Sequence, residues 1–139
     1  MRLKVIITTA ALGTAVCLEA QAMDRWAALS QIETRDNDSA VGAAGEISRF
    51  QIKPKLWRRY ARSDADWRNP AEALAAARQL MKERCTVFER LNSRQPTDFE
   101  FYVLWNAPAQ IDRPARAVRE RAQRFCRLVS RDERPATSQ

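Results

Sequence analysis

Residues 33–52 read ETRDNDSAVGAAGEISRFQI, a glutamate followed by a polar, glycine-containing loop. Upstream of the glutamate, apolar residues recur at helical spacing: Trp26, Leu29 and Ile32. This periodicity predicts a helix that carries Glu33 on its apolar side. A carboxyl group in such a place loses solvation, so its pKa rises and it can keep a proton near neutral pH. Glu33 is therefore a candidate general acid, with a surface or capping glutamate as the alternative.

The same periodicity continues through most of the chain. The sequence NPAE at 69–72 supplies a capping asparagine, a first-turn proline and a glutamate, and predicts a long helix over residues 70–92. The sequence TDFE at 97–100 repeats this capping pattern and predicts a short aromatic helix that ends near Asn106. These signals favour a mainly α fold.

Two further segments complete the predicted architecture. A last helix is predicted near residues 114–131, where apolar positions recur on one side. Residues 35–49 are polar and contain glycine, so we expect an irregular loop or a small hairpin there. The whole is a mainly α domain of about five helices, with a small α+β fold as the alternative.

The N-terminus has the features of a signal peptide over residues 1–22. A charged start precedes a short apolar stretch, and residues 20–22 read AQA, a typical cleavage signal. A lipoprotein signal through Cys17 is disfavoured because a bulky valine precedes the cysteine. We expect residues 23–139 to be exported as one domain, periplasmic or secreted, with a flexible tail at 130–139.

Two cysteines remain in the exported chain, Cys85 and Cys126. Both fall on the apolar side of their predicted helices, and an even cysteine count in an exported chain favours a disulfide. The prediction is a Cys85–Cys126 disulfide, with two buried free thiols as the alternative.

The chain is basic, with 24 Lys and Arg against 17 Asp and Glu and a formal charge of +7. Many of the arginines fall in residues 113–131. Such a surface favours anionic partners, and an anionic cell-wall polymer or a membrane surface suits an exported protein. No nucleic-acid-binding motif accompanies the arginines, so we expect no nucleic acid partner. A solvated helix face is the alternative.

The chain contains no histidine. Catalysis by a Ser-His-Asp or Cys-His arrangement and a His-ligated metal site are therefore excluded. Phosphate-binding and dinucleotide-binding loops are also missing. We expect neither a metal nor an organic cofactor, and acid chemistry by carboxylates remains, as glycosidic bond cleavage requires.

Residues 33–52 resemble the first motif of the soluble lytic transglycosylase family, a branch of the lysozyme-like superfamily, whose pattern is roughly E-S-x-x-N-x-x-A-x-S-x-x-G-A-x-G-L-M-Q. The sequence fits this pattern without a gap. Further on, the NP pair at 69–70 resembles the family's NP element, and LWNA at 104–107 resembles its A-Y-N-A-G segment. The resemblance implies a lysozyme-like fold and a peptidoglycan glycan strand as substrate.

The resemblance also implies roles for single residues. It makes Glu33 the catalytic acid, places Gln51 near the scissile sugar and puts Trp105 at the family's tyrosine position, supported by Asn106. Other positions depart from the pattern. Gly42 replaces a serine, Glu46 an alanine and Ser48 a glycine, while Pro108 replaces a glycine. We expect Ser48 and Glu46 to lie with the substrate-binding residues.

The implied reaction uses Glu33 alone. As an acid it protonates the oxygen between N-acetylmuramic acid and N-acetylglucosamine, and as a carboxylate it takes the proton from the muramyl C6 hydroxyl to give a 1,6-anhydro sugar. A lysozyme-type hydrolase would instead need a second carboxylate, for which Glu46 is the candidate. The other alternative is a non-catalytic cell-wall-binding module. Small members of the family commonly serve envelope-spanning secretion or conjugation machines, so such an assembly is a candidate partner of an otherwise monomeric protein.

Two other tryptophans are candidates for sugar subsites. Trp57 has a spacing that favours the core, and Trp67 precedes the long helix in a polar loop that favours neither role.

Overall fold

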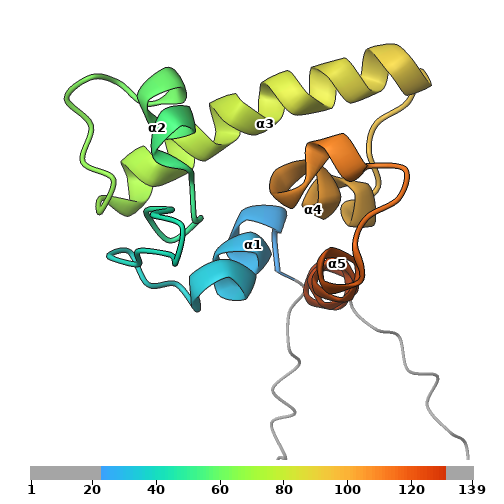
Figure 1. The fold of residues 1–139 in the computed structure, drawn as a ribbon, viewed down its shortest axis with the longest axis horizontal. Helices are drawn as coiled ribbons and strands as arrows, with labels where there is room; N and C mark the ends of the chain where they lie inside the picture. Colours follow the sequence, from blue (N-terminus) through green and yellow to red (C-terminus); the bar gives the residue numbers. More distant parts are fainter. Residues whose placement is uncertain (1–22, 131–139) are drawn as a thin grey trace, which may run out of the picture.

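The computed structural model describes residues 23–130, which form five α-helices and one short 3-10 helix but no β-strand (Figure 1). In chain order they are α1 (Arg25–Thr34), α2 (Pro54–Tyr60), α3 (Pro70–Asn92), α4 (Asp98–Asn106), η1 (Pro108–Gln110) and α5 (Arg116–Val129). The prediction of a mainly α domain of about five helices is confirmed. The alternative with a small β-hairpin is not formed within these residues.

The helix ends follow from their capping residues. Asn69 accepts hydrogen bonds from the backbone of Ala71 and Glu72 at the start of α3, and α3 has the predicted bounds. At α4, Thr97 and Glu100 form the predicted reciprocal capping box. The predicted last helix is confirmed as α5, which is shorter at both ends than residues 114–131, and no side chain caps its start.

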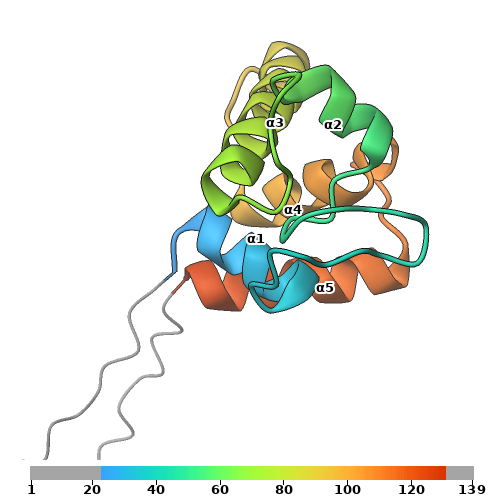
Figure 2. The ribbon, with the colours of Figure 1, turned by 90° about the vertical axis from the view of Figure 1, so that its left-hand side faces the viewer.

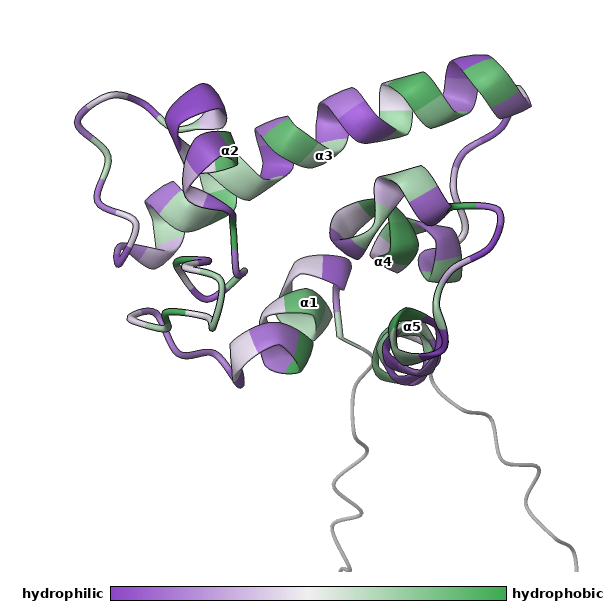
Figure 3. Cartoon of the chain, in the orientation of Figure 1, coloured by the Kyte–Doolittle hydropathy of each residue, from purple (hydrophilic) through white to green (hydrophobic). Residues whose placement is uncertain are grey.

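Helix α4 is the centre of the hydrophobic core. Its residues 101–105 are all buried, and it packs against both α3 and α5, between which Figure 1 shows it. A helix that is apolar on all sides is stable only when other elements surround it. Figure 3 shows hydrophobic and hydrophilic bands alternating along α3, as expected for a helix with one face in the core. Trp57 of α2 is also buried, which confirms its predicted place in the core.

The connection from α1 to α2, residues 35–53, is an irregular loop that projects to one side of the helices (Figure 2). Ile47 forms isolated antiparallel bridges with Val41 and with Ile52. Between Ile47 and Ile52 the chain reverses tightly, with Ser48 at φ 68° and Gln51 at φ 55°. Left-handed backbone at residues other than glycine costs on the order of 1–3 kcal/mol and persists only where the surroundings hold it.

The predicted disulfide between Cys85 and Cys126 is wrong. Both thiols are free, and no two cysteines among the described residues lie at disulfide distance. Cys85 belongs to α3 and Cys126 to α5, and α4 packs between these helices. Burial raises the pKa of both thiols, and the nearby Arg25 guanidinium opposes that shift at each. A predicted place on the apolar side of two helices therefore does not make the two cysteines neighbours.

The two ends of the described chain meet. The backbone N–H of Met23 donates a hydrogen bond to the carbonyl of Leu128 at 2.9 Å. The predicted signal peptide at 1–22 and residues 131–139 of the predicted tail lie outside the described residues. Among residues 23–130, no helix is long and apolar enough to cross a membrane.

Candidate functional site

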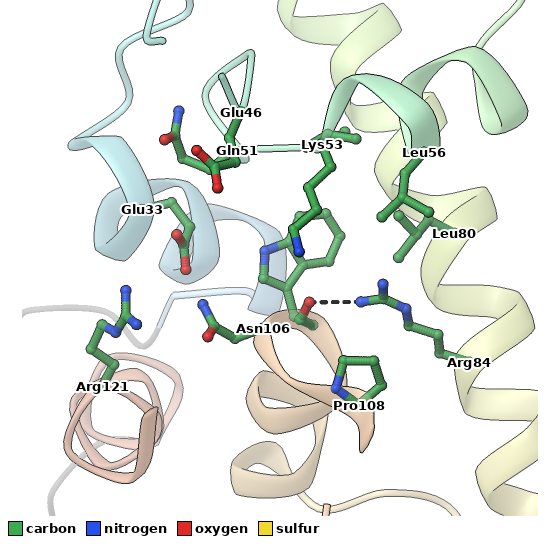
Figure 4. Close-up of a pocket in the computed structure, with 12 residues that line it drawn as sticks. Glu33, Glu46, Gln51, Lys53, Leu56, Leu80, Arg84, Asn106, Pro108 and Arg121 are labelled. Atoms are coloured by element: carbon green, nitrogen blue, oxygen red, sulfur yellow. Dashed lines mark hydrogen bonds between the residues drawn. The ribbon is translucent and has the colours of Figure 1, made fainter. Parts of the chain in front are cut away.

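A cavity of about 470 Å³ opens between α1, the α1–α2 loop and the C-terminal end of α4 (Figure 4). Residues from the other helices complete its walls. The lining residues are Glu33, Glu46, Gln51, Ile52, Lys53, Leu56, Leu80, Arg84, Trp105, Asn106, Pro108 and Arg121. Five of the six residues predicted for catalysis or substrate binding are thus brought together, the exception being Ser48.

Glu33 enters the cavity from the last turn of α1. Its Oε1 accepts a hydrogen bond of 2.7 Å from the hydroxyl of Tyr102, a fully buried residue of α4. Within residues 23–130, the other carboxylate oxygen, Oε2, forms no hydrogen bond. Figure 4 shows the carboxylate between the loop residues and Arg121.

The charge of Glu33 is set by its surroundings. Burial raises its pKa, the Tyr102 hydrogen bond and the positive charge of Arg121 act to lower it, and the negative charge of Glu46 raises it again. The net pKa is raised, so Glu33 keeps its proton to a higher pH than an exposed glutamate. The helix end contributes in the same direction, since the C-terminus of a helix carries partial negative charge. These are the properties of a general acid.

Sequence reasoning missed two residues that act on Glu33. Tyr102 stands in an aromatic run that indicates only a buried helix, and Arg121 is one of many arginines in α5. A signal for Tyr102 did exist, because a buried tyrosine hydroxyl normally needs a hydrogen-bond partner. Arg121 borders the apolar stripe of α5 next to Ala122, which is fully buried, but its neighbour across the fold could not be foreseen.

Glu46 and Gln51 form the loop side of the cavity. Their side chains lie against Gly42, where an added Cβ would make the flexible ends of Glu46 and Gln51 move aside. Glu46 Oε2 also accepts a hydrogen bond of 3.1 Å from the backbone of Ala44. The absence of a side chain at Gly42 therefore makes room for a second carboxylate in the cavity.

The C-terminal end of α4 forms the opposite side. Asn106 and Pro108 line the cavity, and Trp105 lines it while being only 7% exposed, since its ring packs edge-on against Phe50. From α3, Nη1 of Arg84 donates to the carbonyl oxygens of Leu104 and Trp105 at 2.7 and 2.6 Å. The dashed line of Figure 4 marks an Arg84 bond. Arg84 thus satisfies carbonyls of the last turn of α4, which have no partner within the helix.

Two predicted or candidate residues lie elsewhere. Ser48 is fully buried and does not line the cavity, and its Oγ accepts a hydrogen bond from the backbone of Phe50 inside the tight turn. Trp67 is partly buried under the guanidinium of Arg68 and is also absent from the cavity wall.

Within residues 23–130, no group of three or more cysteine and carboxylate side chains could hold a metal ion. No family model, curated protein or solved structure matches the chain.

Proposed function

We propose that this protein is a lytic transglycosylase with a lysozyme-like fold, which cleaves the bond between N-acetylmuramic acid and N-acetylglucosamine in peptidoglycan. The observation that carries the proposal is a partly buried Glu33 of raised pKa in a cavity, hydrogen-bonded through one oxygen only. Because the chain contains no histidine, nucleophilic catalysis by a Ser-His-Asp or Cys-His arrangement is excluded. Acid–base chemistry by carboxylates remains.

In the proposed reaction, Glu33 gives its proton to the glycosidic oxygen while the C1–O bond breaks. The carboxylate formed then takes the proton of the C6 hydroxyl, and O6 bonds to C1 of the same muramyl ring. Tyr102 keeps its hydrogen bond to Oε1, which orients the carboxylate and leaves Oε2 for the substrate. Arg121 stabilises the carboxylate that exists between the two steps. Such acid–base help contributes about 10²–10⁴-fold.

The backbone of the α1–α2 loop supports the resemblance to this family. Gly45 and Ser48 align with glycines of the family's first motif, and both have left-handed backbone, with φ 82° and 68°. Glycine adopts this conformation without cost. The departures at Gly42 and Glu46 are neighbours in space, because the Glu46 carboxylate occupies the space next to Gly42 where a side chain at position 42 would begin.

A lysozyme-type hydrolase is the second candidate. It is favoured by Glu46, whose carboxylate lines the same cavity and acts on the pKa of Glu33. A hydrolase needs a second carboxylate to activate water or to act as nucleophile. Glu46→Gln would then abolish turnover, whereas a lytic transglycosylase would keep it.

Mass spectrometry of the soluble products from isolated peptidoglycan sacculi tests the proposal. The samples are the purified protein, Glu33→Gln, Glu46→Gln and, as a matched control, Glu83→Gln, whose carboxylate lies outside the cavity and accepts from Arg59. We expect 1,6-anhydro products from all samples except Glu33→Gln.

Reducing-end products would assign the hydrolase instead. An absence of products, with retained binding to sacculi, would assign a non-catalytic cell-wall-binding module. Export through residues 1–22 and service to an envelope-spanning secretion or conjugation machine are part of the proposal, and they suit a small domain that opens the cell wall locally.

A further inference from the structure

A second cavity is formed by the C-terminal end of α1 and by α5. Its volume is about 250 Å³, and it is lined by Gln31, Ile32, Arg35, Arg124, Arg127 and Leu128. Three of the six side chains are arginines and none is acidic. Arg35 is the left-handed C-cap of α1, so its backbone is held by the helix end, with its N–H bonded to the Gln31 carbonyl at 3.2 Å.

Several arginines of residues 23–130 are paired with a carboxylate. Arg25 pairs with Asp98, Arg49 with Asp38 and Arg59 with Glu83. Within residues 23–130, Arg35, Arg124 and Arg127 form no ion pair with a carboxylate. Arginines from two elements that lack a carboxylate partner create a positive potential, which attracts anions. The planar donors of a guanidinium group suit carboxylates in particular.

Neighbouring turns of α5 contribute to the two cavities. Arg121 lines the first cavity and Arg124 the second, and residues three apart are neighbours on the surface of a helix. Burial and Glu33 raise the pKa of Tyr102, whereas Arg121 and Arg124 both act to lower it. Both guanidinium groups are therefore within electrostatic reach of the Glu33–Tyr102 pair.

We infer that Arg35, Arg124 and Arg127 form a second binding site, which takes carboxylates of acidic peptide side chains on the same strand whose sugars occupy the Glu33 cavity. This inference rests on the proposed function, because the strand must be peptidoglycan. The two cavities would then bind the same polymer, with its sugars at Glu33 and its charged substituents at the arginines. The protein would prefer strands that carry acidic peptides.

Binding measurements test this without depending on cleavage. Dissociation constants are measured for two soluble probes, peptidoglycan strands with their peptides intact and the same strands with the peptide carboxylates amidated. The proteins are the full chain, Arg124→Gln/Arg127→Gln and the control Arg113→Gln/Arg119→Gln. The control removes the same charge from the same part of the chain, but its residues line neither cavity.

We expect the full chain to bind the intact strands about fivefold more tightly than the amidated strands, as two or three exposed ion pairs provide. The preference should vanish in Arg124→Gln/Arg127→Gln, persist in the control and weaken with added salt. An equal preference for intact strands in both double variants would show that only net charge matters, and it would contradict the proposed site. The absence of any preference in the full chain would contradict it as well. If sacculi yield no products but this preference is seen, the proposed reaction fails while the carboxylate site stands.

Discussion

Glu33 is held between opposing influences, which makes its protonation sensitive to single substitutions. Burial raises its pKa, while Tyr102 and Arg121 act to lower it. An acid catalyst works only while it carries its proton, so the high-pH side of the activity profile reports this pKa. The effect of Tyr102 or Arg121 on this pKa can therefore be tested by the direction in which a substitution moves the high-pH side of the profile.

Tyr102→Phe removes the hydrogen bond that lowers the pKa of Glu33. We expect the high-pH side of the kcat/KM profile to move to higher pH, and the maximal rate to fall by about tenfold because the carboxylate loses its orientation. Measuring kcat/KM against pH checks this. Tyr60→Phe is the matched control, since its hydroxyl bonds to Glu83 outside the cavity. A shift to lower pH would refute the role given to Tyr102.

Glu33 also links stability to pH. Its folded pKa lies above the ordinary glutamate value of 4.5, so the folded protein binds more protons than the unfolded chain between pH 4.5 and the raised pKa. The free energy of unfolding therefore falls as the pH rises through this window. We expect Glu33→Gln to match the wild type below the window and to be more stable above it. Urea unfolding at several pH values measures the difference, and a variant less stable at all pH values would contradict this account.

At the scale of single elements, capping chemistry made the helices predictable. The bounds of α3 and the capping box of α4 follow from NPAE at 69–72 and TDFE at 97–100, because these caps act within one turn of the chain. The shape of the α1–α2 loop was not predictable. Its left-handed residues Ser48 and Gln51 have no propensity for that backbone, which goes with the hydrogen bonds that Ile47 and Ile52 exchange across the turn.

The C-terminal end of α4 depends on a residue of another helix. Arg84→Met keeps most of the side-chain volume but removes the hydrogen bonds to Leu104 and Trp105. We expect a loss of about 2 kcal/mol in the free energy of unfolding, the scale of hydrogen bonds to a charged group. Urea unfolding checks this, with the exposed Arg78→Met of the same helix as control. Equal stabilities of the two variants would show that the α4 carbonyls do not need Arg84.

At the scale of the whole molecule, periodicity identified inward-facing residues but not their neighbours. Glu33 was predicted because its own helix places it, whereas its contact with Tyr102 joins residues far apart in the sequence. The cysteines illustrate the same limit. Cys85 and Cys126 were both predicted to face inward, yet both are only half-buried and α4 packs between their helices. Which surfaces meet depends on the packing of all helices together.

Free thiols lead to a simple prediction about stability. A disulfide closing a loop of this size would contribute about 4 kcal/mol, and a reducing agent would remove that contribution. Because Cys85 and Cys126 are free, we expect a reducing agent to leave the temperature of thermal unfolding unchanged. Differential scanning calorimetry with and without reductant makes the comparison. A marked fall on reduction would contradict the separation of the two helices.

The hydrogen bond between Met23 and Leu128 brings the start and the finish of the folded unit to one point, and neither residue lines the Glu33 cavity. A unit with adjacent ends can be spliced into a surface turn of a host protein, or have its ends joined and be reopened elsewhere, without stretching its fold. The domain can therefore be inserted into another protein as one unit. A larger assembly that carries it at this one point would leave the Glu33 cavity open, whereas the second cavity, which Leu128 lines, lies next to the attachment.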